Sequence, residues 1–141
     1  GLDISKKALD TAIKNSNKMK LGNKCKFFKT SLDQIFNYKF DFIVSNPPYI
    51  SIKELPKLSV DVKKYDPRIA LAGGVDGYAS YNVIVGNAQR FLKPGGRLVT
   101  EVGLGQSEHI SRLFDKCGFV DIKVSKDLSS IDRVVSGRKQ S

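Results

Sequence analysis

The sequence has little that could build a disulfide framework, a metal site or a membrane anchor. Its two cysteines, Cys25 and Cys117, lie far apart without metal-ligand spacing, so we expect reduced thiols and no bound metal. The single histidine, His109, falls on a polar helix face and is expected at the surface. No apolar run approaches the roughly 20 residues that span a bilayer, and no signal peptide is recognisable. These absences predict a soluble cytoplasmic protein.

Acidic residues are also scarce, because 14 aspartates and glutamates stand against 24 lysines and arginines, for a formal net charge of +10. The first forty residues hold nine lysines and no arginine. Such a basic surface could attract nucleic acid through its phosphates. These lysines are nevertheless spread along a predicted helix without interleaved aromatic residues, which is typical of a solvated helix face. The charge therefore does not identify a partner.

What remains is the composition of one domain, since 141 residues with 40% hydrophobic content can bury a core. A continuous apolar run over 40–45 predicts a strand buried on both faces, and Pro47 and Pro48 end it. Apolar spacing predicts a helix after Ser5, its N-cap, and a second helix from Tyr81. In chain order we expect a helix from 5 to about 21–23, strands 24–30 and 40–45, a long loop over 50–75, a helix 81–92, a strand 97–102, a helix 110–117, and strands 119–124 and 132–136.

This alternation of helices and strands predicts an α/β fold with a mostly parallel sheet. The last two strands follow each other without a helix, so they are expected to form an antiparallel pair at one edge. In open α/β sheets, ligands bind outside the carboxyl ends of the strands. Asp3 and Asn46 both lie at such ends, which makes this edge the candidate site.

The string Asn46-Pro47-Pro48-Tyr49 carries the most chemical information. The Asn46 side-chain oxygen and the Pro47 carbonyl can both accept hydrogen bonds from one NH₂ group, which aims its nitrogen at an incoming methyl group. The prolines stiffen the loop, and the Tyr49 ring can pack on a planar substrate. The alternative is a tight Pro-Pro turn in which Asn46 only caps the chain. At the end of a buried strand, the string predicts methylation of a planar amide or amine nitrogen.

Two further candidates are weaker. Asp3 ends a predicted strand where related folds bind ribose hydroxyls, although it could equally cap the following helix. Glu101, followed by Gly103 and Gln106, is a charged residue late in a buried strand. It faces either a pocket or solvent.

Six segments of the chain, taken together and in order, carry a family resemblance. They are Asp3-Ile4-Ser5, Ile43-Val44-Ser45-Asn46-Pro47-Pro48-Tyr49-Ile50, Tyr65-Asp66-Pro67-Arg68-Ile69-Ala70-Leu71, Gly73-Gly74-Val75-Asp76-Gly77, Glu101-Val102-Gly103 and Asp132-Arg133-Val134-Val135. The chain resembles the release factor glutamine methyltransferase family (HemK/PrmC) over essentially its whole length. The Asn-Pro-Pro-Tyr string is shared with DNA adenine methyltransferases and some ribosomal ones, whereas the Tyr-Asp-Pro-Arg and Gly-Gly-Val-Asp-Gly segments are more particular to this family.

The resemblance implies a Rossmann-like class I methyltransferase fold that uses S-adenosylmethionine, without a metal or a covalent enzyme intermediate. It implies that Asn46, Pro47 and Tyr49 are catalytic. With Pro48, they would bind the glutamine side-chain amide in the Gly-Gly-Gln motif of peptide chain release factors. The family's expected partners are therefore release factors rather than nucleic acid.

The resemblance also implies a cofactor site. Asp3 would hold the ribose of S-adenosylmethionine, and Asn46 would border the cofactor as well as the substrate. The family has an acidic residue near the adenine, and the aligned position here is Ser31, with Asp33 close by. The segment 65–77 would wall the substrate pocket.

The family's N-terminal helical domain, first strand and glycine-rich loop have no counterpart in residues 1–141. We therefore expect a partial catalytic domain, which belongs to a monomer when complete. The missing strand is central in the family's sheet, so inner strand edges would stay unpaired. By itself the chain is expected neither to bind cofactor well nor to fold stably.

Two alternatives remain open. One is a DNA or RNA methyltransferase that acts on an exocyclic adenine or guanine amine after flipping the base out of the stack. The basic charge favours it, whereas the lack of a recognition module or an aromatic ladder disfavours it. The other alternative is an inactive truncated or split-gene product.

Overall fold

The computed structural model describes residues 1–34, 38–59, 61 and 67–140, which belong to two compact units, Gly1–Tyr38 and Lys39–Ser141. The first unit contains β1 (Leu2–Asp3), α1 (Lys6–Lys18), β2 (Phe28–Lys29) and the 3-10 helix η1 (Leu32–Gln34). The second contains β3 (Phe40–Ser45), the 3-10 helix η2 (Leu55–Lys57), α3 (Arg68–Leu71), α4 (Ala79–Phe91), β4 (Leu92–Glu101), α5 (Ser107–Lys116), β5 (Phe119–Lys126) and β6 (Asp132–Lys139). No helix in these described ranges is both long and apolar enough to cross a membrane.

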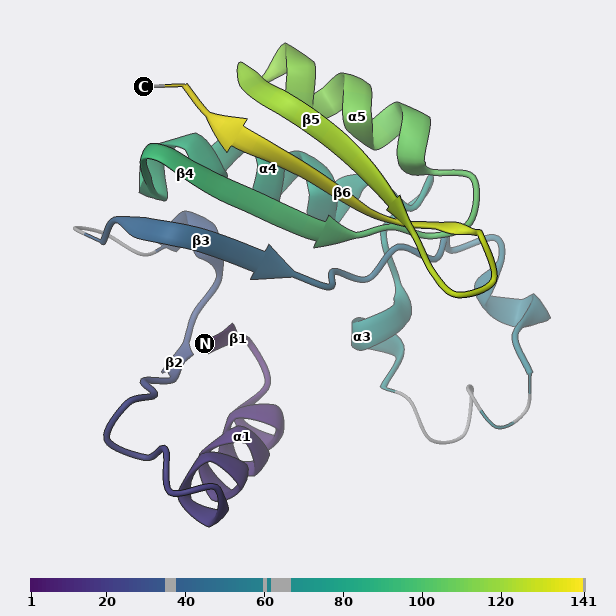
Figure 1. The fold of residues 1–141 in the computed structure, drawn as a ribbon. Helices are drawn as coiled ribbons and strands as arrows, with labels where there is room; N and C mark the ends of the chain where they lie inside the picture. Colours follow the sequence, from purple (N-terminus) through teal and green to yellow (C-terminus); the bar gives the residue numbers. More distant parts are fainter. Residues whose placement is uncertain (35–37, 60, 62–66, 141) are drawn as a thin grey trace. The chain divides into compact units, whose positions relative to one another are not determined.

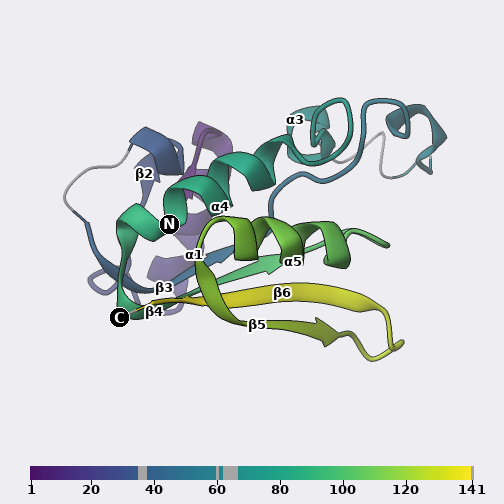
Figure 2. The ribbon, with the colours of Figure 1, turned by 90° about the horizontal axis from the view of Figure 1, so that it is seen from above.

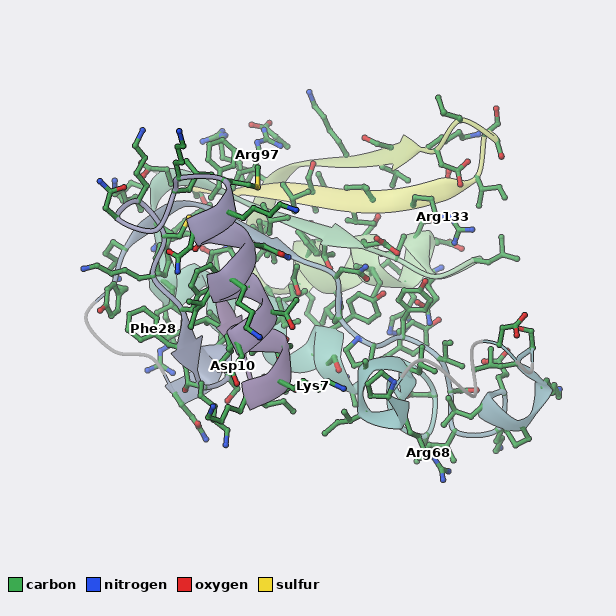
Figure 3. The ribbon with its side chains drawn as sticks, turned by 90° about the horizontal axis from the view of Figure 1, so that it is seen from below. Lys7, Asp10, Phe28, Arg68, Arg97 and Arg133 are labelled. Atoms are coloured by element: carbon green, nitrogen blue, oxygen red, sulfur yellow. The ribbon has the colours of Figure 1, made fainter. Side chains whose placement is uncertain are left out.

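The first unit is a short strand–helix–strand segment. β1 and β2 pair in parallel, with Leu2 opposite Phe28. The predicted N-cap is confirmed, because the Ser5 hydroxyl accepts a hydrogen bond from the Ala8 N–H at 3.3 Å. α1 is shorter than predicted and ends at Lys18. Lys7 and Asp10 are exposed on it (Figure 3), in agreement with a solvated helix face.

The second unit is built on a four-stranded sheet in the order β3-β4-β6-β5. β3 and β4 are parallel, and β6 runs antiparallel to both β4 and β5. The predicted antiparallel pair of final strands is therefore confirmed, with β5 at one edge. Figures 1 and 2 show α4 and α5 on the same side of this sheet.

The core of the second unit lies between these two helices and that side of the sheet. Tyr81 on α4, Leu98 on β4 and Phe114 on α5 are fully buried there. Val135 of β6 is also fully buried, and the rings of Phe114 and Phe119 lie 5.0 Å apart. Apolar burial of this kind contributes most of the stability of a domain.

The prediction that the strand over 40–45 is buried on both faces is wrong. Phe42 is 65% exposed and Val44 is 76% exposed. Both residues alternate with Ile43, which packs against the core, so they lie on the sheet face opposite α4 and α5. No strand of the described residues pairs with the second edge of β3.

Gly86 offers a test of helix energetics in α4. It lies in the middle of the helix and is exposed, and a Cβ added there would meet no atom within 4 Å. A glycine inside a helix costs about 0.5–1 kcal/mol relative to alanine. In the full-length protein, we expect Gly86→Ala to raise the free energy of unfolding by that amount, measured as a higher urea midpoint. An unchanged or lower midpoint would contradict the prediction.

The turn between β5 and β6 is organised by one carboxylate. Asp127 accepts hydrogen bonds from the backbone N–H groups of Ser129 at 2.8 Å and Ile131 at 3.1 Å. Its second oxygen forms an ion pair with Arg133 at 3.1 Å, and Figure 3 labels this arginine. The hydrogen bond from the Ile131 N–H is the main cause that holds the pKa of Asp127 below its usual value. Arg133 and the Ser129 N–H lower it further.

This lowered pKa predicts a pH dependence of stability. A carboxylate with a depressed folded pKa contributes its full stabilisation above its unfolded pKa of about 4, and loses it as the pH falls through the folded pKa. We therefore expect the urea midpoint of the full-length protein to decrease as the pH is lowered below about 4. In Asp127→Asn this decrease should be less steep. Asp115→Asn, at an exposed helix position, should keep the parent slope. Equal slopes in all three proteins would show that Asp127 makes no such contribution.

Candidate functional site

The candidate active-site loop leaves the sheet at the carboxyl end of β3. Asn46 is exposed and Pro47 is buried. Within the described part of the chain, no hydrogen bond involves the Asn46 side chain or the Pro47 carbonyl oxygen. Asn46 therefore does not cap the chain, as the alternative interpretation required. Neither acceptor is thus occupied by another group of the described residues.

The residues after this loop are held by backbone hydrogen bonds. The Ile50 N–H donates to the Leu71 carbonyl at 3.0 Å, and the Ile50 carbonyl accepts from the Gly73 N–H at 2.8 Å. The Ile52 N–H donates to the Gly74 carbonyl at 3.0 Å. These bonds attach the start of the long loop to the segment after α3, which restricts the conformations of residues 46–49.

Two glycines let that segment approach the loop closely. A Cβ on Gly73 would lie 2.8 Å from the Pro48 carbonyl oxygen and 2.8 Å from the Tyr49 Cα. A Cβ on Gly77 would lie 2.5 Å from the Tyr49 carbonyl oxygen. Such separations are too short for any side chain, so the Gly-Gly-Val-Asp-Gly segment is needed for the loop to adopt this position.

The Tyr49 side chain lies beside the carboxyl end of β4. Its hydroxyl is 3.5 Å from the Glu101 carboxylate, a long hydrogen bond, and its ring contacts Gly103, where a Cβ would be only 2.9 Å from the ring. β3 and β4 are parallel with Ser45 opposite Thr100, so both strands deliver their next residues to the same edge. The sequence left open whether Glu101 faces a pocket or solvent; in the structure its carboxylate is half-buried beside the Tyr49 hydroxyl.

Two polar side chains complete the arrangement. Gln106 donates from Nε2 to the Tyr49 carbonyl at 3.1 Å and accepts at Oε1 from the Gly103 N–H at 3.0 Å. The Tyr81 hydroxyl lies 3.0 Å from the Glu101 carbonyl oxygen and 3.3 Å from Gln106 Oε1. Burial raises the pKa of Tyr81, so this hydroxyl stays protonated and remains a donor.

The sequence interpretation missed the role of Tyr81. Its place in an apolar helical stripe predicts only a core residue, which it is. Its hydroxyl was the signal that could have indicated a polar contact, since a buried tyrosine usually needs a hydrogen-bond partner. His109, in contrast, is exposed as predicted, and its ring stacks on Tyr78 with centroids 4.0 Å apart.

The predicted cofactor residues Asp3 and Ser31 belong to the first unit. Asp3 ends β1 and is exposed, and its Oδ1 accepts a hydrogen bond from the Ser5 N–H at 2.7 Å. Oδ2 has no hydrogen bond to any residue in the described ranges, so one carboxylate oxygen is left for a ligand. Ser31 is half-buried directly before η1, and Asp33 belongs to that helix.

The predicted pocket wall over 65–77 lies partly within the described residues. Tyr65 and Asp66 lie outside the described residues, whereas Arg68, on α3, is labelled in Figure 3.

Cys25 and Cys117 are both free thiols and half-buried.

Three comparisons relate the chain to known proteins. The sequence profile of the Eco57I restriction-modification methylase family matches residues 2–100. A release factor glutamine methyltransferase from Bradyrhizobium diazoefficiens is 42% identical over 140 residues, which cover 99% of this chain and 47% of that protein. One from Geobacter sulfurreducens is 41% identical over 139 residues, covering 98% of this chain and 48% of that protein. The chain spans about half the length of these curated relatives, and they confirm the resemblance drawn from its motifs.

The structure also has relatives. A methyltransferase from Pyrococcus furiosus superposes with a TM-score of 0.66 at 16% identity, covering 99% of this chain and 61% of that one. This likeness shows the fold, and it confirms the predicted α/β, Rossmann-like methyltransferase class.

Proposed function

Because the chain belongs to the Eco57I restriction-modification methylase family and is similar to release factor glutamine methyltransferases over nearly its whole length, we propose that it is the catalytic part of a longer methyltransferase. The substrate is the side-chain amide nitrogen of the glutamine in the Gly-Gly-Gln motif of peptide chain release factors. A substrate of this kind implies a cytoplasmic reaction. Residues 1–141 then form a partial catalytic domain of a protein that acts as a monomer.

One observation carries the chemistry: two oxygen acceptors, on consecutive residues at the end of β3, have no hydrogen-bond partner among the described residues. The Asn46 side-chain oxygen and the Pro47 carbonyl accept the two hydrogens of one NH₂ group. This double contact holds the amide plane in one orientation and stabilises the positive charge that develops on nitrogen. The nitrogen lone pair would form the new N–C bond while the bond between the methyl carbon and the donor's sulfonium sulfur breaks, with its electron pair left on sulfur. One N–H proton would then be lost to solvent.

Tyr49 is proposed to hold the planar amide in place with its ring. The contacts of that ring with Gly103 and of its hydroxyl with Glu101 hold the side chain in one position. An aromatic face in a fixed position accepts a planar group with little loss of conformational entropy. Pro48 restricts the backbone between Pro47 and Tyr49, which keeps the acceptors and the ring at a constant separation.

The proposed cofactor is S-adenosylmethionine, which supplies an electrophilic methyl group on a sulfonium centre when it is bound. Asp3 suits the ribose, because its Oδ2 has no hydrogen bond to any described residue and can accept one from a hydroxyl group. Ser31 is proposed to lie near the adenine, and Asn46 to border the cofactor on the substrate side. No metal takes part in the proposed reaction.

A second candidate is methylation of an exocyclic amine in DNA. The name of the matching family favours it, since that family is described as a restriction-modification methylase. An aromatic amine offers the same two hydrogens to Asn46 and Pro47. We prefer the release factor because relatives bearing that name match 98–99% of the chain at 41–42% identity.

One competition experiment separates the two substrates. The full-length protein is incubated with S-adenosylmethionine, an unmethylated release factor and duplex DNA together, and mass spectrometry locates the added methyl group. We expect one methyl group on the Gly-Gly-Gln glutamine and none on DNA. A release factor with asparagine in place of that glutamine is the matched control and should stay unmodified. Methylated adenine with an untouched release factor would overturn the proposed substrate.

A further inference from the structure

We propose that Gln106 is a positioning residue for the Asn46–Tyr49 loop, and that it acts by donating a hydrogen bond to the Tyr49 carbonyl. The proposal rests on the proposed function, because it assigns a role within the same site. Gln106 does not touch the substrate in this account. It holds the backbone from which the catalytic acceptors project.

The orientation of the Gln106 amide follows from its partners. The Gly103 N–H can only donate, and it faces Oε1 at 3.0 Å, whereas the Tyr49 carbonyl can only accept, and it faces Nε2 at 3.1 Å. Reversing the amide would place like atoms together in both contacts. The Tyr81 hydroxyl has a single hydrogen, which faces both the Glu101 carbonyl at 3.0 Å and Oε1 at 3.3 Å, so the orientation rests on the Gly103 and Tyr49 contacts. Gln106 therefore connects the loop after β3 to the loop after β4 through one rigid amide group.

The position of Gln106 in the chain makes this contact unusual. Gln106 is the N-cap residue of α5, where side chains usually accept from the helix's own first N–H groups. Its side chain makes no such capping hydrogen bond. It instead extends to Tyr49, 57 positions earlier in the sequence. Stability of α5 alone would favour serine or aspartate at this position, so glutamine is better explained by the contact with Tyr49.

Two glycines lie close to the Gln106 amide. A Cβ on Gly103 would lie 2.8 Å from Gln106 Oε1, and a Cβ on Gly77 would lie 3.0 Å from Gln106 Nε2. Glycines on both sides of the amide thus allow it to reach the Tyr49 carbonyl. Tyr49 is three residues from Asn46, so a shift of its carbonyl changes where the Asn46 and Pro47 oxygens meet a substrate. Misplacement by about 1 Å can cost a hundredfold in rate.

The test compares Gln106→Glu with Gln89→Glu in the full-length protein. Glutamate keeps the shape and the Oε1 acceptor of Gln106, but it cannot donate to the Tyr49 carbonyl. Gln89 is the matched control, because it is also half-buried and donates from Nε2 to a backbone carbonyl, that of Cys117, at 3.2 Å. The readouts are kcat and KM for release-factor methylation, and hydrogen exchange of the backbone amides of residues 49–52.

We expect Gln106→Glu to lower kcat about ten- to a hundredfold, with the KM for S-adenosylmethionine unchanged. The amides of Ile50 and Ile52 should exchange faster, since their hydrogen bonds to the 71–74 segment depend on the loop position. Gln89→Glu should change neither readout. Gln106→Leu, which keeps the bulk but no hydrogen bond, should behave like Gln106→Glu.

Two results would overturn the proposal. Gln106→Glu with parent kcat and parent exchange would show that the donated hydrogen bond does not position the loop. Equal losses in Gln106→Glu and Gln89→Glu would show a general destabilisation instead. If the parent protein methylates no substrate, the proposed function fails, and the exchange of residues 49–52 still decides whether Gln106 holds the loop.

Discussion

Replacing Asn46 by alanine is expected to lower kcat for methylation of the release-factor glutamine by about 10²–10³-fold, the loss typical of removing one preorganised electrostatic contact. The substitution removes one of the two acceptors that hold the amide hydrogens. Its effect on stability should be small, because Asn46 is exposed and its side chain hydrogen-bonds to no residue in the described ranges. Single-turnover kinetics with the full-length protein would measure the loss in the chemical step.

Two further variants make this test specific. Asn82→Ala changes an exposed asparagine on α4 and should leave kcat unchanged. Asn46→Asp keeps an acceptor oxygen, so it should retain more activity than Asn46→Ala, which would link the loss to the acceptor and not to the amide NH₂. A variant that raises KM while keeping the parent kcat would indicate uniform substrate binding by Asn46, and would contradict its role in the transition state.

The position of the candidate loop could be predicted from local sequence. The apolar run over 40–45 and the two prolines after it are local signals, and β3 has these bounds. The burial of β3 could not be predicted in this way. Alternating or continuous apolar residues indicate which residues favour burial, but not which layer of the molecule covers them. Phe42 and Val44 are apolar and yet exposed, because no described layer of the second unit covers their face of the sheet.

Most of the support of the loop could not be predicted from the sequence. The Gln106–Tyr49 contact joins residues 57 positions apart, and no period or turn signal connects them. Tyr81 looks like any aromatic residue of a core helix until its hydroxyl is seen near Glu101 and Gln106. The Gly-Gly-Val-Asp-Gly segment carried a signal, since glycines this dense suggest a close backbone approach. Only the structure identifies the Tyr49 backbone as what they approach.

The second large effect is expected at Gly77. Its φ of +85° favours glycine, and a Cβ there would lie 2.5 Å from the Tyr49 carbonyl oxygen. Alanine would therefore meet two penalties: a left-handed conformation costing about 1–2 kcal/mol, and a contact with backbone that can be relieved only by moving the loop. We expect Gly77→Ala to lower kcat/KM about a hundredfold, as expected for displaced catalytic groups.

Gly95→Ala separates the two penalties. Gly95 has a φ of +75°, and a Cβ added there would meet nothing within 4 Å, so its substitution carries the conformational cost alone. If Gly95→Ala loses stability but keeps its activity, whereas Gly77→Ala loses activity, the loss comes from displacing the Tyr49 carbonyl. If both lose activity equally, general destabilisation explains the effect and the close approach of Gly77 has no special role. Where the loss does come from the Tyr49 carbonyl, the double variant Gly77→Ala with Gln106→Glu should lose little more activity than either single variant, because both changes release the same carbonyl group.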